Sequence, residues 1–165
     1  MPPIADRLAL AERTMTALVT DAELPPKIGV HPRAAGSFAH AMPALLRGRD
    51  SDGSSDLLGI KWVAGFAGNR AVDLPAINAI VTLSDPRTGL PIAILDGGPI
   101  TAQRTAAVSG VAIASFGPGA PWRGAGLGRP ARVTLIGAGV QGHSHLEVLG
   151  HVLPGCSMTV VDRHR

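Results

Sequence analysis

The sequence has few of the residues that indicate a secreted, membrane or nucleic-acid-binding protein. Its 165 residues include one cysteine, no tyrosine, two tryptophans and three phenylalanines. A single thiol, Cys156, cannot form an internal disulfide, which excludes the disulfide framework of a small secreted domain. There is no run of 18 apolar residues and no basic leader followed by an apolar stretch. We therefore expect a soluble, cytoplasmic protein.

Lysine is also scarce. Of the 15 basic residues 13 are arginine, and only Lys27 and Lys61 are lysine. The arginines are scattered and do not alternate with aromatic residues, so no nucleic-acid partner is expected despite the net charge of +3. With 45% hydrophobic and 16% charged residues, the chain predicts a packed core.

The first two thirds of the chain predict a mixture of helix and antiparallel strands. Apolar residues recur every three or four positions over residues 4–19, which predicts an amphipathic helix. Ser84–Gly89 has the Asp, Pro and Gly of a hairpin turn, which indicates antiparallel pairing of its neighbours. An Ala-rich segment over 101–116 predicts a second helix. The expected strands are residues 27–30, 37–41 (ending at Met42-Pro43), 59–66, 76–83 and 91–95.

The last third begins with a segment rich in glycine and proline, residues 117–130, which is typical of a linker. We therefore predict a first domain over 1–118, a linker over 119–130 and the start of a second domain over 131–165.

The predicted second domain opens with a dinucleotide-binding pattern. Residues 132–136 form a short apolar strand, and Gly137, Gly139 and Gly142 follow in the spacing G-x-G-x-x-G. A helical stretch and a second strand come next, and Asp162 lies twenty residues beyond Gly142. The glycines permit a tight turn, close approach of a pyrophosphate and close helix–strand packing. The first βαβ unit of a Rossmann domain is therefore predicted.

The nature of the bound dinucleotide depends on the end of the second strand. Asp162 would accept hydrogen bonds from a ribose 2′-hydroxyl, which favours NAD. Arg163 and Arg165 are able to bind a 2′-phosphate, so NADP stays open. The alternative is a glycine-rich turn that binds no ligand.

Three cations of the first domain are candidates for binding an anion. Lys61 lies within an apolar strand, where an unpaired charge is costly, so it either extends to solvent or meets an anion. Arg104 lies one turn into the predicted helix, where the helix dipole disfavours a cation. Lys27 could simply be exposed. His143 and His145 lie two positions apart on a helix and do not share a face, so no metal site is expected.

Several runs of residues, in order, resemble the ornithine cyclodeaminase/mu-crystallin family. The runs are PPKIGVHP, SFAHAMPA, GIKWVAGFAGN, TLSDPRTGLPIAILDG, ITAQRTAAVSG and LIGAGVQGHSH, within residues 24–165. The resemblance implies an α/β protein. An N-terminal α+β domain binds substrate and mediates homodimerisation, and a Rossmann domain then binds NAD or NADP.

The resemblance also implies roles for individual residues. Lys27, Lys61 and Arg104 match positions that hold the substrate carboxylate, although Lys27 stands where the family usually has arginine. The implied cofactor contacts are Arg104, Gly137, Gly139, Val140, Gln141, Gly142 and Asp162. Ala76 stands where some ornithine cyclodeaminases have a threonine that contacts the cofactor.

The activity implied is the NAD-dependent conversion of L-ornithine, or a related amino acid, to L-proline and ammonia. Two alternatives remain open. One is an NAD(P)H-dependent cyclic imine reductase or amino-acid dehydrogenase, and the other is a ligand-binding protein without catalysis. The family's catalytic aspartate falls beyond Arg165, so the catalytic residue is unknown. We expect a truncated Rossmann domain and no activity from these residues alone.

Overall fold

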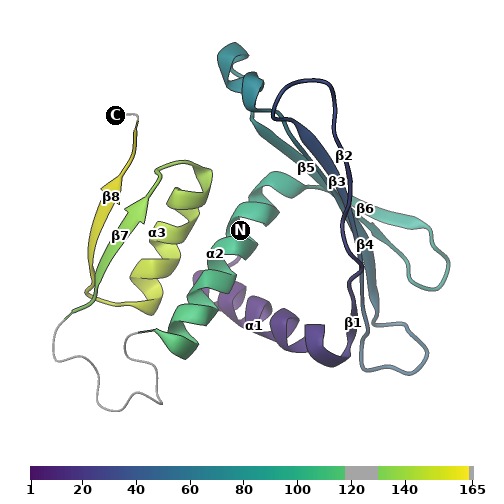
Figure 1. The fold of residues 1–165 in the computed structure, drawn as a ribbon. Helices are drawn as coiled ribbons and strands as arrows, with labels where there is room; N and C mark the ends of the chain where they lie inside the picture. The colour runs from purple at the N-terminus through teal and green to yellow at the C-terminus, as the bar shows by residue number, and fades with distance from the viewer. Residues whose placement is uncertain (118–129, 164–165) are drawn as a thin grey trace. The chain divides into compact units, whose positions relative to one another are not determined.

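The computed structural model describes residues 1–117 and 130–163 (Figure 1). Packing groups the chain into two compact units. We call the first, Met15–Ile100, the sheet unit. The second consists of Met1–Thr14 and Thr101–Arg165, and we call it the βαβ unit.

The predicted domain boundary falls in a part of the chain that the structure largely leaves undescribed. Of the predicted linker over 119–130, only residue 130 belongs to the described residues. The packing units also assign most of the helix before the linker to the βαβ unit. The division into domains over 1–118 and 131–165 therefore stays a prediction.

Three helices supply residues to the βαβ unit: α1 (Ile4–Thr20), α2 (Gly97–Phe116) and α3 (Val140–Val152). They pack closely at Gly110 of α2. A Cβ atom there would lie 2.5 Å from Val148 Cγ1 of α3 and 2.6 Å from Leu8 Cδ2 of α1. Ala106, one turn before Gly110, is fully buried. Small residues on α2 thus let both neighbouring helices approach its backbone.

Polar contacts join the same three helices. Arg7 of α1 donates hydrogen bonds to Gln103 of α2 and to Glu147 of α3, the latter at 3.2 Å. Ser109 of α2 and His145 of α3 are hydrogen-bonded at 3.0 Å. These contacts fix the rotation of each helix about its own axis as well as its position.

The sheet unit is a six-stranded antiparallel sheet in the order β1-β3-β4-β5-β6, with β2 also paired to β3. A 3₁₀ helix, η1 (Ala67–Val72), follows the fourth strand. The strands are β1 (Ala22–Glu23), β2 (Ile28–Val30), β3 (Phe38–Leu46), β4 (Leu57–Gly65), β5 (Ile77–Ser84) and β6 (Pro91–Asp96).

The predicted hairpin between β5 and β6 is confirmed. The two strands pair antiparallel, and the Asp85 carboxylate accepts the backbone N–H groups of Arg87 at 2.8 Å and Thr88 at 2.9 Å. Gly89 has a φ of +74°, the conformation expected for glycine in such a turn. Turn residues alone were sufficient to predict this pairing.

The prediction that a strand ends at Met42-Pro43 is wrong, because β3 continues to Leu46. On one side Pro43 is paired with Ile60 of β4. On the other side of β3, β2 pairs with its residues only as far as Ala41, and β1 pairs with Leu45 and Leu46. The gap between them accommodates a proline, which has no N–H group to donate to a neighbour.

Alternation of side chains divides the sheet into two faces. Ile28, Trp62 and Ile80 are aligned by register on one face and are 68%, 43% and 48% exposed. Ile60 and Ile94 lie on this face in the next row and are also exposed. We call this surface the apolar face. The opposite face carries Lys61, and we call it the lysine face.

The strand–turn–helix–strand order predicted for the βαβ unit is confirmed. β7 (Arg132–Ile136) pairs parallel with β8 (Ser157–Val161), and α3 connects them (Figure 1). Among the helices of the described residues, none is long and apolar enough to cross a membrane.

Candidate functional site

The turn between β7 and α3 has the geometry that its three glycines predict. Gly137 adopts a φ of +104°, which side chains other than glycine rarely tolerate. A Cβ on Gly139 would meet nothing within 4 Å, so the backbone there is open to a ligand. A Cβ on Gly142 would lie 2.1 Å from the Gly137 carbonyl oxygen. Only glycine at position 142 therefore lets α3 start so close to the turn.

The N-terminus of α3 is open to an anion. Gly139 is the N-cap residue and supplies no side-chain hydrogen bond to the first turn. Val140 is 73% exposed and Gln141 is exposed as well. The first N–H groups of a helix have no partner inside the helix, and with the helix dipole they favour a negatively charged group. The turn and the helix start thus fit a pyrophosphate.

Asp162 lies directly after β8, beside the same turn. Its carboxylate accepts the backbone N–H of Ala138, and the Gly137 N–H donates to the Val161 carbonyl at 2.7 Å. The carboxylate is therefore held within reach of whatever binds on the turn. Arg163 is exposed next to it, whereas Arg165 lies outside the described residues. Asp162 thus lies beside the glycine turn, and its contact with a ribose stays a prediction.

The two lysines are brought to one face of the sheet. Lys61 of β4 is paired with Met42 of β3, and Gly29 of β2 is paired with His40. Lys27 lies two residues before Gly29, and alternation places it in the same row as Met42 and Lys61. Lys27 is exposed and Lys61 is half-buried. The two lysines therefore lie on the same face of the sheet, and their binding of one anion stays a prediction.

His40 is a residue of the lysine face that sequence reasoning missed. Its ring stacks on Phe38 with the centroids 4.6 Å apart, and it lies over Gly29, where a Cβ would come within 2.9 Å of His40 Cδ2. Burial lowers the pKa of His40 below its usual value, and the positive charges of Lys27 and His31 lower it further. No pattern within one segment indicated this contact, because it depends on the register of β2 against β3, which pairs Gly29 with His40.

Arg104 lies deeper in its helix than predicted. α2 begins at Gly97, so Arg104 lies two turns from the helix start and the dipole no longer disfavours it. Gly97 fits tightly against β5, since a Cβ there would lie 2.8 Å from Ala79 Cβ. Pro99 is compatible with the first helical turn because its missing N–H has no partner there. Arg104 is exposed and belongs to the βαβ unit, so a site shared with the lysines stays a prediction.

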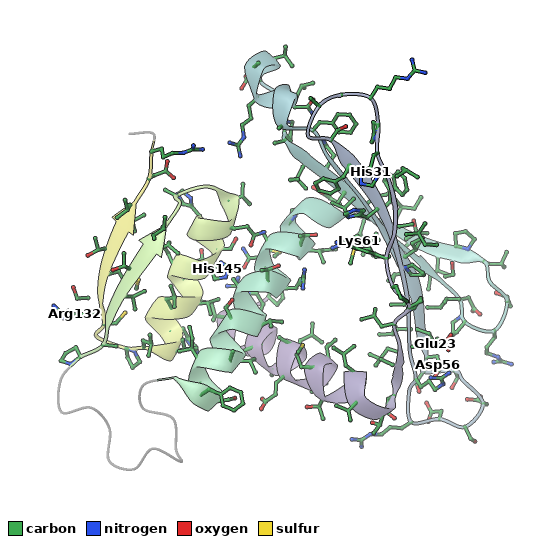
Figure 2. The ribbon with its side chains drawn as sticks, viewed as in Figure 1. Glu23, His31, Asp56, Lys61, Arg132 and His145 are labelled. Atoms are coloured by element: carbon green, nitrogen blue, oxygen red, sulfur yellow. The ribbon has the colours of Figure 1, made fainter. Side chains whose placement is uncertain are left out.

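No metal site is found in the part of the chain that the structure describes. There, no three side chains among His, Cys, Asp and Glu are grouped closely enough to hold an ion. His145, one of the two histidines considered for metal binding, instead hydrogen-bonds Ser109 and lies 2.7 Å from the Gln141 carbonyl oxygen through Nδ1 (Figure 2).

A sequence model described as the ornithine cyclodeaminase/mu-crystallin family matches residues 5–165. The chain belongs to this family. The resemblance inferred from the sequence is thus confirmed over almost the whole chain.

Curated relatives of this family member include a bacterial and a mammalian protein. The nodulation efficiency protein NfeD of Rhizobium meliloti is 37% identical over 97% of the chain, which spans 45% of that relative. The ketimine reductase mu-crystallin of Mus musculus is 35% identical over 67% of the chain, which spans 31% of it. The chain therefore spans less than half the length of both proteins.

Solved structures of similar fold support the α/β architecture. A Δ1-pyrroline-2-carboxylate reductase of Thermococcus litoralis, solved with NADH and L-proline, has a TM-score of 0.80 and 28% identity, covering 99% of this chain and 46% of that one. An archaeal alanine dehydrogenase dimer with bound NAD has a TM-score of 0.79 and 26% identity, covering 99% and 45%. A lysine cyclodeaminase has a TM-score of 0.70 and 30% identity, covering 98% and 42%.

Proposed function

We propose that the protein is an NAD(P)H-dependent reductase of small cyclic imino acids that carry a carboxylate. The observation that carries the proposal is the glycine turn, where an open Gly139 backbone, an uncapped helix start and the Asp162 carboxylate meet. The similar reductase solved with NADH and L-proline supports this reaction class. So does the mammalian relative, which is named a ketimine reductase.

The cofactor would be held by the main chain of the βαβ unit. The N–H groups at the start of α3 would bind the pyrophosphate, and Asp162 would accept hydrogen bonds from the adenosine ribose. When bound, the cofactor supplies a hydride to an electrophilic carbon. Asp162 favours NADH, and the neighbouring Arg163 leaves NADPH as a second ligand to test.

The substrate would be held by the sheet unit. Lys27 and Lys61 would bind the carboxylate of the substrate, with Arg104 as the third cation that the family resemblance implies. Two or three charged hydrogen bonds on one carboxylate fix its orientation, so that the imine carbon presents one face to the hydride donor. The imine nitrogen then gains a proton, and the product is the cyclic amino acid.

A second candidate function is the cyclodeamination of L-ornithine to L-proline and ammonia. The similarity to a lysine cyclodeaminase at 30% identity favours it. It would use the same two binding regions, because an imino acid intermediate carries the same carboxylate. The difference is that its hydride leaves the substrate first and returns later, so that no cofactor is consumed.

We also propose that the protein forms a homodimer through the apolar face of the sheet unit. Trp62 of β4 and Ile80 of β5 are exposed there as direct partners on neighbouring strands, and Ile28 is exposed in the same row. An exposed apolar surface of this kind marks an interaction site. The similar archaeal alanine dehydrogenase is a dimer, which favours a second copy as the partner. Trp62→Glu should yield monomers by light scattering, and a dimer that persists would contradict the proposal.

One experiment separates the two reactions. Intact protein is incubated with NADH and Δ1-pyrroline-2-carboxylate, and NADH oxidation is followed by absorbance. In parallel, L-ornithine and a catalytic amount of NAD⁺ are tested for ammonia release. Imine-dependent NADH oxidation without ammonia release supports the reductase, and the reverse supports the cyclodeaminase. NADH binding with neither activity supports a ligand-binding protein, and no NADH binding contradicts all three.

A further inference from the structure

The lysine face carries a histidine that fits the substrate site as well as the lysines do. His40 of β3 is one strand away from Lys61 and lies two residues along from Met42, the partner of Lys61. Residues two apart on a strand point to the same face, so His40 and Lys61 share the lysine face. Lys27 lies two residues before Gly29, the partner of His40, and its positive charge lowers the pKa of His40.

The surroundings of His40 keep its ring in place. Phe38 stacks on one side, at 4.6 Å and an interplanar angle of 27°. Gly29 leaves the space that the ring occupies, because a Cβ at that position would approach Cδ2 to 2.9 Å. Gly29 has no positive φ that would require glycine for backbone reasons. Glycine at position 29 is therefore explained by the space that the His40 ring needs, and not by the backbone conformation.

We propose that His40 is a further substrate-binding residue, which takes up a proton when a carboxylate binds between Lys27 and Lys61. This inference rests on the proposed function and adds a residue to its substrate site. Before binding, burial and the positive charges of Lys27 and His31 lower the pKa of His40, which favours the neutral imidazole at pH 7. A bound carboxylate cancels that repulsion and accepts a hydrogen bond from the imidazolium, which favours the protonated form.

Two of the charged groups around His40, Lys27 and His31, lower its pKa. Lys27 and His31 directly flank β2, and Lys61 lies on β4. Figure 2 labels His31 and Lys61 at the sheet. β3 carries no other ionisable side chain. β1 contributes Glu23, which lies opposite Leu45, five positions from His40, and is ion-paired with Arg47.

Linkage gives the expected pH dependence. Because binding raises the pKa of His40, the complex holds more protons than the free protein, so affinity rises as pH falls. For each unit by which binding raises the pKa of His40, affinity rises about tenfold as pH falls from above the pKa of the complex to below the pKa of the free protein. The affinity for L-proline in the presence of NADH should therefore rise severalfold, up to about tenfold, between pH 8 and pH 6.

The test is isothermal titration calorimetry of L-proline into the intact protein with NADH. Titrations in two buffers of different ionisation enthalpy count the protons taken up. Wild-type protein should take up a fraction of a proton at pH 7, and His40→Gln should take up none and lose the pH dependence of affinity. Titration of the ligand itself is common to both proteins. An unchanged proton uptake in H40Q would overturn the inference.

Two further variants make the result specific. Gly29→Ala keeps His40 but pushes its ring away from β2, and it should lose the proton uptake too; wild-type uptake would refute the role of the ring's placement. His151→Gln, on the exposed last turn of α3, should behave as wild type, and a loss of uptake there would also count against His40. If wild-type protein binds neither L-proline nor the imine, the proposed function fails, and this inference with it.

Discussion

The proposed anion-binding sites of the βαβ unit and the sheet unit use different parts of the chain, the main chain in the first and side chains in the second. In the βαβ unit the main chain is exposed, because Gly137, Gly139 and Gly142 have no side chains in the way. In the sheet unit the main chain is engaged in strand pairing, so the proposed substrate site depends on the charges of the lysine side chains. The first kind of site is therefore destroyed by adding an atom, whereas the second is destroyed by removing a charge.

The largest effect is expected for Gly142→Ala. The added Cβ would lie 2.1 Å from the Gly137 carbonyl oxygen, and a backbone atom cannot move aside as a side chain can. Overpacking of this kind costs about 3 kcal/mol or more, so affinity for NADH should fall about 100-fold or more. Fluorescence titration with NADH measures it.

The matched control is Gly150→Ala on the same helix. A Cβ there would lie at an ordinary 3.5 Å from the flexible end of Met158. NADH affinity should stay at the wild-type level. If G142A also binds NADH normally, the main chain of this turn is not the anion site.

Removal of one charge from the lysine face should come next in size. Lys61→Met keeps the aliphatic stem but loses the ammonium group. A charged hydrogen bond contributes about 1.5–3 kcal/mol, so affinity for L-proline should fall about 10- to 100-fold while NADH affinity is unchanged. Calorimetry with each ligand checks both statements. Arg49→Met, in the exposed loop before β4, is the control, and equal losses in the two variants would contradict the assignment.

Asp162→Asn tests the one side chain that the turn of the βαβ unit does use. Loss of the carboxylate should weaken NADH about tenfold and NADPH much less, since a 2′-phosphate no longer meets a negative charge. The ratio of the two dissociation constants is the measurement. A ratio equal to that of wild type would show that Asp162 does not read the ribose.

The smallest effect concerns the β5–β6 turn, away from both anion regions. Two backbone N–H groups lower the pKa of Asp85 below its usual value. A carboxyl whose pKa is lower in the folded state stabilises the fold above the unfolded pKa, near 3.9, and loses this as pH falls through the folded pKa. Asp85→Ala should therefore lower the melting temperature slightly at pH 7 and less at pH 3. Equal differences at both pH values would contradict it.

The two units also differ in how much of each could be predicted from the sequence. The glycine turn was predicted because its geometry depends on residues close together in the chain, from Gly137 to Gly142. Asp162 was predicted because one helix and one strand fix its distance from that turn. Local rules therefore predicted nearly the whole candidate cofactor region.

The substrate region was harder to predict, since it depends on strand register. Nothing in the sequence around His40 shows that it faces Gly29, which is eleven residues earlier. The continuation of β3 past Pro43 likewise depends on where β1 and β2 stop along its edge. Pairing between distant segments decided both features, and patterns within one segment do not contain that information.

The row formed by Lys27, Met42 and Lys61 fixes the distance between the backbones of the two lysines. Lys61 lies on β4 and Lys27 directly precedes β2, so β3 alone separates them, and neighbouring strands lie about 4.8 Å apart. Their backbones are thus about 9.6 Å from one another, a span held by the ladders of three strands. Loops could change in length without altering this distance. The sheet therefore sets the size of the acid group that both lysines could bind together. Only a shift in strand register would change that size.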